Sequence, residues 1–154
     1  MWRRRDWSRL RKCSGAERLL LAEAVLWLGL SRAATLTLPF RWTVRLFALQ
    51  PEAEPLPDNG RRNPAAVLVA WALRAAASRT PWQSTCLAQA LAGARMLQRR
   101  KIACSIALGV ARSAQTPESL EAHAWLSCGN EILTGAAGSD RYNVVARFAL
   151  RAPV

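Results

Sequence analysis

The hydrophobic positions follow a helical period over the first two thirds of the chain and a strand period after that. Apolar side chains recur at three- and four-residue steps over residues 17–38, 65–79 and 84–100, which indicates three helices. From residue 102 onward apolar residues alternate with small or polar ones, as in strands with one buried face. Helices followed by a run of strands are typical of the α+β class, so we expect an α+β fold.

Local signals mark where the helices begin and end. Ser14 and Glu17 form a capping box ahead of the first helix, and Pro39 breaks that helix. A shorter helix is expected over residues 42–49. Pro64 suits the first turn of the helix that follows, because its missing N–H is not needed there.

The last third predicts an antiparallel sheet of about four strands. The first strand covers residues 102–110, and two more form a hairpin around Gly129-Asn130. A turn at residues 135–140 leads to a final strand over residues 141–150. This sheet is expected to pack on the helix over residues 84–100.

A proline-rich stretch suggests how the chain is divided. Residues 50–64 hold four prolines and one glycine, which is typical of a linker or a long surface loop. We therefore expect a basic arm and helical extension over residues 1–50, a linker over residues 51–63, and a mixed domain over residues 64–154.

The first helix bears on location. Glu23 and Arg32 leave only eight uncharged residues between them, fewer than the roughly 20 that a membrane span needs. The basic start of the chain lacks the apolar stretch of a signal peptide. We therefore expect a cytoplasmic protein, with attachment of the N-terminal helices to a membrane surface as the alternative.

Composition adds a strong positive charge and four cysteines. The 154 residues are 51% hydrophobic, enough for a core, and carry a formal net charge of +12. That charge predicts affinity for an acidic partner without choosing one, and the arginine-rich, alanine-rich composition can also reflect codon bias. The cysteines show no C-x-x-C spacing, so we expect free thiols, no metal site and no cofactor.

Two residues are candidates for catalysis. Cys86 stands at the expected start of the helix over residues 84–100, after Thr80-Pro81, with Ser84 or Thr85 as the cap. Unpaired N–H groups at a helix N-terminus favour a thiolate and can hold an oxyanion. His123, the only histidine, lies on an expected strand and could take the thiol proton.

Ordinary structural roles stand beside this hypothesis. Cysteine is often buried in cores, and a lone strand histidine is usually structural. The order of the two residues along an α+β chain nevertheless favours a Cys–His dyad. Cys104 is expected in the core, Cys128 borders a turn, and Cys13 lies in the basic arm.

The motifs around both residues resemble a known family. The segment Pro81-Trp82 with Cys86-Leu87, the helix end at residues 98–102, and Gly109-Val110 are similar to motifs of the transglutaminase-like cysteine peptidases of lasso-peptide maturation, the microcin-processing protein family. His123-Ala124-Trp125-Leu126 resembles the H-A-W-V motif of that family. The apolar lead-in over residues 17–40 is also similar, so the resemblance covers nearly the whole chain.

The resemblance implies a transglutaminase/papain-like core and a cysteine endopeptidase. It would remove the leader from a ribosomally made precursor peptide. A separate asparagine-synthetase-like, ATP-dependent cyclase would then close the lasso. A separate leader-binding protein resembling the PQQ chaperone is implied, because residues 1–50 are too apolar and helical to be such a module.

The chain departs from the family pattern after the histidine. Family members often carry an Asp about twelve residues further on, where this chain has Gly135. Asp140 is our candidate to orient the imidazole, while Glu131 is expected to be out of register, and a dyad without a carboxylate is also workable.

Three further side chains could border the site. Gln83 could donate to an oxyanion, and Trp82 and Trp125 could wall the cleft, although a solvent-facing turn and the core are their ordinary places. Arg99 and Arg100 could steer an acidic leader.

A second function class remains open. A basic, non-catalytic binding or scaffold module for an acidic peptide, nucleic acid or membrane surface would explain the charge directly. The chain shows no known nucleic-acid motif and no stacking platform, so we expect no nucleic-acid partner.

Overall fold

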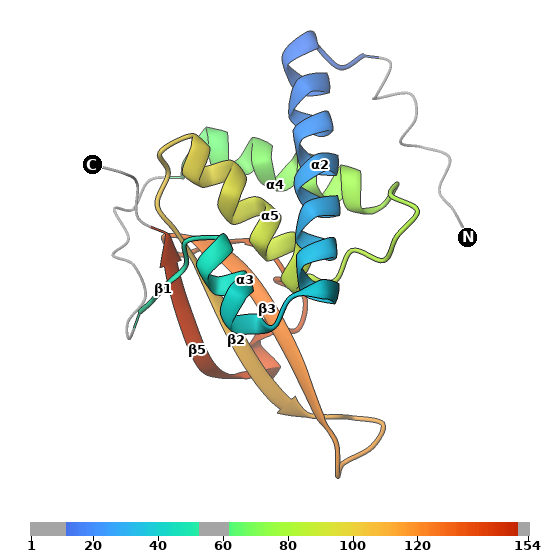
Figure 1. Ribbon diagram of the computed structural model, residues 1–154, viewed down its shortest axis with the longest axis vertical. Helices are drawn as coiled ribbons and strands as arrows, with labels where there is room; N and C mark the ends of the chain where they lie inside the picture. Colours follow the sequence, from blue (N-terminus) through green and yellow to red (C-terminus); the bar gives the residue numbers. More distant parts are fainter. Residues whose placement is uncertain (1–11, 53–61, 151–154) are drawn as a thin grey trace.

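The computed structural model describes residues 12–52 and 62–150, which form a group of helices packed at one side of an antiparallel sheet (Figure 1). Most of the expected basic arm (residues 1–11), most of the expected linker (residues 53–61) and residues 151–154 lie outside the described residues. The helices are α2 (Gly15–Thr37), α3 (Phe40–Leu46), α4 (Pro64–Ala77) and α5 (Cys86–Arg99), with a short 3-10 turn η2 (Ser139–Arg141).

The predicted starts of α2 and α4 are confirmed. The Ser14 hydroxyl accepts a bond from the backbone N–H of Glu17, whose carboxylate accepts from the N–H of Ser14, so the capping box closes at α2. Pro64 occupies the first turn of α4, where the Asn63 side chain accepts from the following N–H groups. The short helix begins earlier than expected, at Phe40, directly after Pro39.

Within the described residues five strands form the sheet, in the order β1-β5-β2-β3-β4, and every paired neighbour is antiparallel. Their bounds are β1 (Gln50–Pro51), β2 (Cys104–Arg112), β3 (Leu120–Cys128), β4 (Glu131–Thr134) and β5 (Asn143–Leu150). The hairpin predicted at Gly129-Asn130 joins β3 to β4, and Gly129 takes the positive φ of 58° that such a turn uses.

Strand β1 was not expected. It consists of two residues at the start of the proline-rich stretch, where Pro51 pairs with Phe148 at the sheet edge. Proline is tolerated on an edge strand because no neighbour needs its missing N–H. The division of the chain at residues 51–63 remains a prediction.

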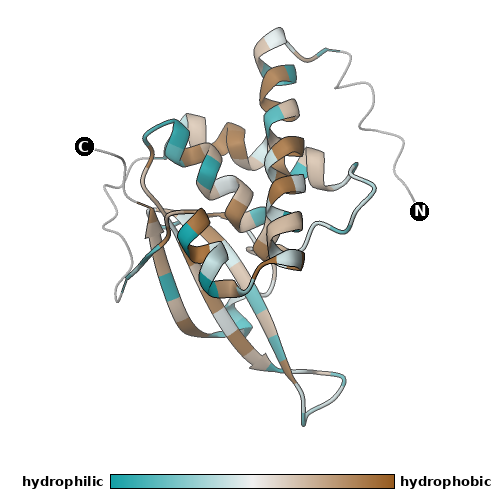
Figure 2. Cartoon of the chain, viewed as in Figure 1, coloured by the Kyte–Doolittle hydropathy of each residue, from teal (hydrophilic) through white to brown (hydrophobic). Residues whose placement is uncertain are grey.

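Helix α5 lies against the sheet and is buried along most of its length. Its side chains Leu91, Met96 and Leu97 are fully buried, and Gly93 faces Leu126 of β3. A Cβ atom at Gly93 would stand 2.5 Å from a methyl of Leu126, so the missing side chain lets the helix approach the strand closely. Figure 2 shows apolar residues concentrated where the helices meet.

Helix α2 packs against α5. Its buried residues Ala24 and Leu28 belong to the shared core, and the Glu23 carboxylate binds the Arg100 guanidinium at 2.7 Å and Arg99 at 3.3 Å. Contrary to the sequence-based expectation, α2 is long and apolar enough to cross a membrane by length and composition, with 22% of its most apolar window buried. Helices of soluble cores and signal sequences share those properties.

Candidate active site

Cys86 is the first residue of α5, and the residues before it set the helix start. Thr85 is the N-cap, and its hydroxyl accepts from the backbone N–H of Ala88 at 3.3 Å. The Gln89 side-chain amide donates to the Ser84 carbonyl at 2.9 Å and ties the preceding turn to the helix. The predicted position of Cys86 at a helix N-terminus is therefore confirmed.

The helix start surrounds Cys86 with positive partial charge. The N–H groups of Cys86 and Leu87 have no carbonyl partner within the helix, because the first turn of any α-helix lacks them. Together with the helix dipole, such groups stabilise a thiolate or an oxyanion. The local backbone thus suits a nucleophilic thiol and a developing negative charge on a substrate oxygen.

His123 lies on β3, paired with Gly109 of β2. On its other side β4 ends at Thr134, and the chain turns at Gly135 with a φ of +76°. This turn brings the Gly135 carbonyl oxygen within 2.8 Å of the His123 Nε2 atom.

That hydrogen bond fixes the tautomer of the neutral ring. A carbonyl oxygen can only accept, so Nε2 must carry the proton and donate it. The neutral imidazole then has its lone pair on Nδ1, the form that a general base needs. Among the described residues no hydrogen bond occupies Nδ1.

Two aromatic rings pack beside the His123 imidazole. The Tyr142 ring lies 5.0 Å from the His123 ring and the Trp125 ring lies 6.0 Å away, centroid to centroid, at tilts of 32° and 31°. Both aromatic side chains also pack over Gly109, where a Cβ atom would stand 2.7 Å from Tyr142 and 2.9 Å from Trp125. Gly109 therefore makes room for the rings beside His123.

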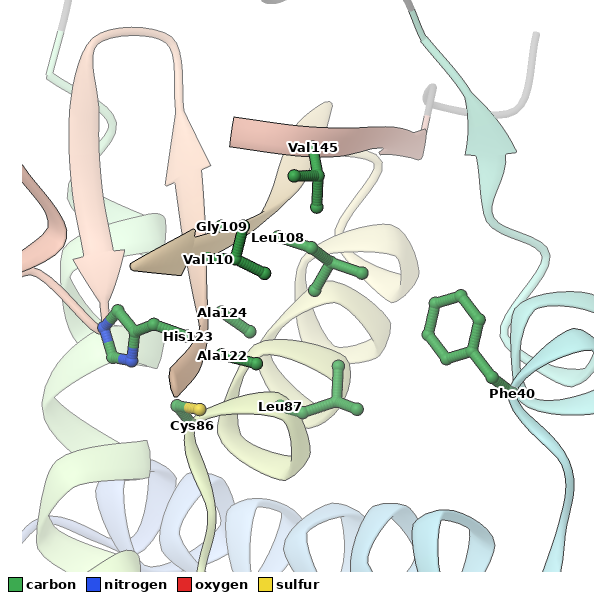
Figure 3. A pocket seen from close by; sticks show the side chains of 10 residues that line it. All are labelled: Phe40, Cys86, Leu87, Leu108, Gly109, Val110, Ala122, His123, Ala124 and Val145. Carbon is green, nitrogen blue, oxygen red and sulfur yellow. The ribbon is translucent and has the colours of Figure 1, made fainter. Parts of the chain in front are cut away.

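Cys86 and His123 line the same pocket, which has a volume of about 300 Å³ (Figure 3). The rest of its lining is apolar: Phe40, Leu87, Leu108, Gly109, Val110, Ala122, Ala124 and Val145. Figure 3 shows Cys86 close to the His123 ring at one side of the view and Phe40 of α3 at the other side.

The thiol and the imidazole are neighbours without being bonded. No hydrogen bond joins Cys86 to His123, and Figure 3 shows the ring on the opposite side of β3 from the Ala122 and Ala124 side chains. Catalytic hydrogen bonds often form only when substrate is bound.

Asp140 is not brought to the imidazole. It lies exposed on η2, and the ring nitrogen that a carboxylate would occupy is bonded to Gly135. Glu131 is also elsewhere, in a 2.9 Å ion pair with Arg62. The geometry therefore gives no support to the prediction that Asp140 orients His123.

The remaining candidates lie away from the pocket lining. Trp82 is half-buried against α2, where its ring faces Gly29, and Trp125 is buried beside His123. Gln83 is exposed in the turn before α5, so its oxyanion role stays a prediction. Arg99 and Arg100 both bind Glu23, which gives them a structural partner.

Cys86 and Cys104 are free thiols, and Cys104 is fully buried. Burial raises the pKa of the Cys104 thiol to about 12, and the neighbouring Cys128 adds to the rise. Cys104 is therefore a core thiol. Within residues 12–52 and 62–150, no group of three His, Cys, Asp or Glu side chains could hold a metal ion.

Sequence reasoning missed the partner of His123, because a main-chain acceptor has no residue-type signature. The available signal was the glycine itself, which stands where the resembled family carries an acid. Tyr142, whose ring lies by the imidazole, was also missed.

Comparison with known proteins adds the family. Residues 34–147 match the family model described as the Transglutaminase-like superfamily, which includes cysteine peptidases. A search of curated proteins and a search of solved structures each found no match. The match begins in the last turn of α2 and extends through the following elements into β5, and the predicted α+β fold class is confirmed. With a partly exposed cysteine opening α5 and a histidine on the adjacent sheet, this chain belongs to the Transglutaminase-like superfamily.

Proposed function

We propose that this protein is a cysteine endopeptidase that removes the leader from a ribosomally synthesised lasso-peptide precursor. The observation that carries the proposal is the shared pocket of Cys86, at the N-terminus of α5, and His123, on β3. Family membership supports cysteine-based chemistry. The resemblance of the motifs around both residues to leader peptidases supports the narrower substrate class.

In the first half of the reaction the thiol attacks the scissile peptide. His123 Nδ1 takes the proton from Cys86 Sγ, and the sulfur adds to the carbonyl carbon. The resulting oxyanion lies near the N–H groups that open α5. When the tetrahedral intermediate collapses, the imidazolium gives its proton to the departing amine, and the leader remains on Cys86 as a thioester.

Water completes the second half. His123 takes a proton from water, the hydroxide adds to the thioester carbonyl, and the C–S bond breaks. The thiolate regains a proton from the imidazolium, and the leader leaves as a carboxylic acid. The freed amine of the core peptide is then available to a separate cyclase for ring closure.

The lining of the pocket bears on the substrate. Phe40, Leu108 and Val145 offer only hydrocarbon to whatever enters. Such a wall suits an apolar side chain next to the scissile bond, because it removes apolar surface from water, and it disfavours an acidic one. An acidic leader would instead be bound outside this pocket, in our proposal by a separate leader-binding protein.

Cleavage of a precursor tests the function. The full chain is incubated with the precursor peptide and the leader-binding protein encoded by genes flanking its own, and products are read by mass spectrometry. We expect one cut that yields a leader with a free carboxylate. Cys86→Ala should abolish the cut. Cys13→Ala, which changes a cysteine just before α2, should leave the cut unchanged.

The competing hypothesis is a basic binding module with no chemistry. It predicts that Cys86→Ala and His123→Ala leave the biological activity intact while binding to the partner falls steeply with salt. Cleavage that survives Cys86→Ala in the purified protein excludes the peptidase proposal.

A further inference from the structure

The hydrogen-bond partner of the His123 ring is a main-chain atom. His123 Nε2 and the Gly135 carbonyl oxygen are 2.8 Å apart, a normal length for an N–H···O bond. In triads of this kind a carboxylate occupies that side of the ring and selects the tautomer. No carboxylate bonds to the His123 ring among the described residues, although Asp140 lies only five residues further on.

We propose that the Gly135 carbonyl does the work of the triad carboxylate and that Gly135 is the positioning residue of the site. This inference rests on the proposed peptidase function. The carbonyl fixes the proton on Nε2, leaves Nδ1 to receive the thiol proton, and stabilises the imidazolium with its partial negative charge. Tyr142 and Trp125 restrict the ring plane, so a neutral acceptor suffices to hold it.

The backbone at Gly135 is shaped for this contact. Its φ of +76° lies in the left-handed region, which glycine enters without cost. A Cβ atom there would collide with the carbonyl oxygen of Ala124 and lie 3.0 Å from the Trp125 backbone. Any side chain at position 135 must therefore push the turn away from β3 and carry the carbonyl with it.

The fact that the chain has one histidine makes the proposal measurable without substrate. The full chain, produced without a histidine tag and labelled with ¹⁵N-histidine, gives the signals of His123 alone. At alkaline pH, where imidazole is neutral, we expect the pattern of a protonated Nε2 and a bare Nδ1. A ring protonated on Nδ1, or an even mixture of tautomers, overturns the proposal.

Two glycine variants separate the carbonyl from general strain. Gly135→Ala adds a Cβ atom that meets backbone. Gly138→Ala, in the same turn with a φ of +73°, meets only the Arg141 side chain at 4.0 Å. We expect Gly135→Ala to mix the tautomers and to lower kcat at least tenfold with little change in KM. Gly138→Ala should keep the Nε2-protonated ring and kcat within about twofold.

The outcomes distinguish this inference from the proposed function. An Nε2-protonated ring in a protein that cuts no precursor contradicts the peptidase function. Cleavage by a protein whose ring is protonated on Nδ1 contradicts the role of Gly135. If Gly135→Ala fails to fold, the tautomer of the unaltered chain still decides.

Discussion

Gly135 packs against the main chain of Ala124 so closely that no side chain fits between them. Gly135 stands where members of the resembled family carry an Asp, and its own carbonyl meets the His123 ring at 2.8 Å. The turn at Gly135 and strand β3 therefore leave no room for a side chain at position 135, and an Asp there fits only if the turn moves.

Gly135→Asp is expected to lower activity, although it restores the family residue. The new side chain would need a φ of +76° and would collide with Ala124, so the turn must open and withdraw the carbonyl from the ring. Steady-state cleavage kinetics should show a fall in kcat of at least tenfold. An activity equal to or above that of the unaltered chain would show that a carboxylate fits after all.

Asp140→Asn should leave cleavage within about twofold, because this exposed carboxyl on η2 makes no bond to the imidazole. His123→Ala in the same assay should remove measurable turnover. A loss of a hundredfold or more in the Asp140 variant would mean that the loop closes onto the ring when substrate binds, and it would reinstate the triad.

Thiol labelling should rank the cysteines by burial and helix position. Cys86 opens α5 and is partly exposed, so iodoacetamide near neutral pH should modify it first. The Cys104 thiol, with its pKa raised by burial to about 12, should react only after unfolding. Peptide mass spectrometry over time reads the order, and early modification of Cys104 would contradict the structure.

The same buried thiol makes stability depend on alkaline pH. The unfolded chain releases the Cys104 proton near its ordinary pKa of 9.0, whereas the folded chain holds it until about 12. The folded state thus binds more protons in that interval, and stability falls as pH rises through it. Cys104→Ala should flatten this part of the pH–stability curve in urea unfolding.

Lys101→Gly should stabilise the fold. Lys101 follows α5 with a φ of +56°, in the region where a side chain is strained and where helices commonly end in glycine. Relief of that strain, less the extra backbone entropy of glycine, should raise the free energy of unfolding by about 1 kcal/mol. Lys101→Ala keeps the strain and serves as the control in urea unfolding; an equal gain there would contradict the explanation.

The residue types in the sequence predict several local features of the fold correctly. Ser14 with Glu17, Pro64, and the Gly129 turn each favour one local geometry, and the structure has it. Strand β1 was not predicted, because a strand of two residues is too short to show a periodic pattern. Pro51 joins the sheet only by pairing with its neighbour β5. Strand β2 has the predicted length but lies two residues further along the chain, since strand ends depend on partners rather than on local sequence.

The site was predictable to the extent that it is made of side chains. Cys86 and His123 have distinctive chemistry, and the sequence places one at a helix start and the other on a strand. The bond to Gly135 depends on where β4 ends and how the chain turns there. A peptide carbonyl exists at every residue, so nothing in the sequence marks the one that contacts the ring.

Because the acceptor of the His123 bond is a main-chain carbonyl, the mutations that remove it differ from those that remove a carboxylate. A carboxylate can be lost by a single substitution at its own position, but a peptide oxygen is present whatever residue is encoded. A mutation can break the contact with His123 only by changing the shape of the turn between Thr134 and Ser139. Loss of this acceptor would therefore come from uncharged residues that touch no substrate, through a change in the shape of one loop.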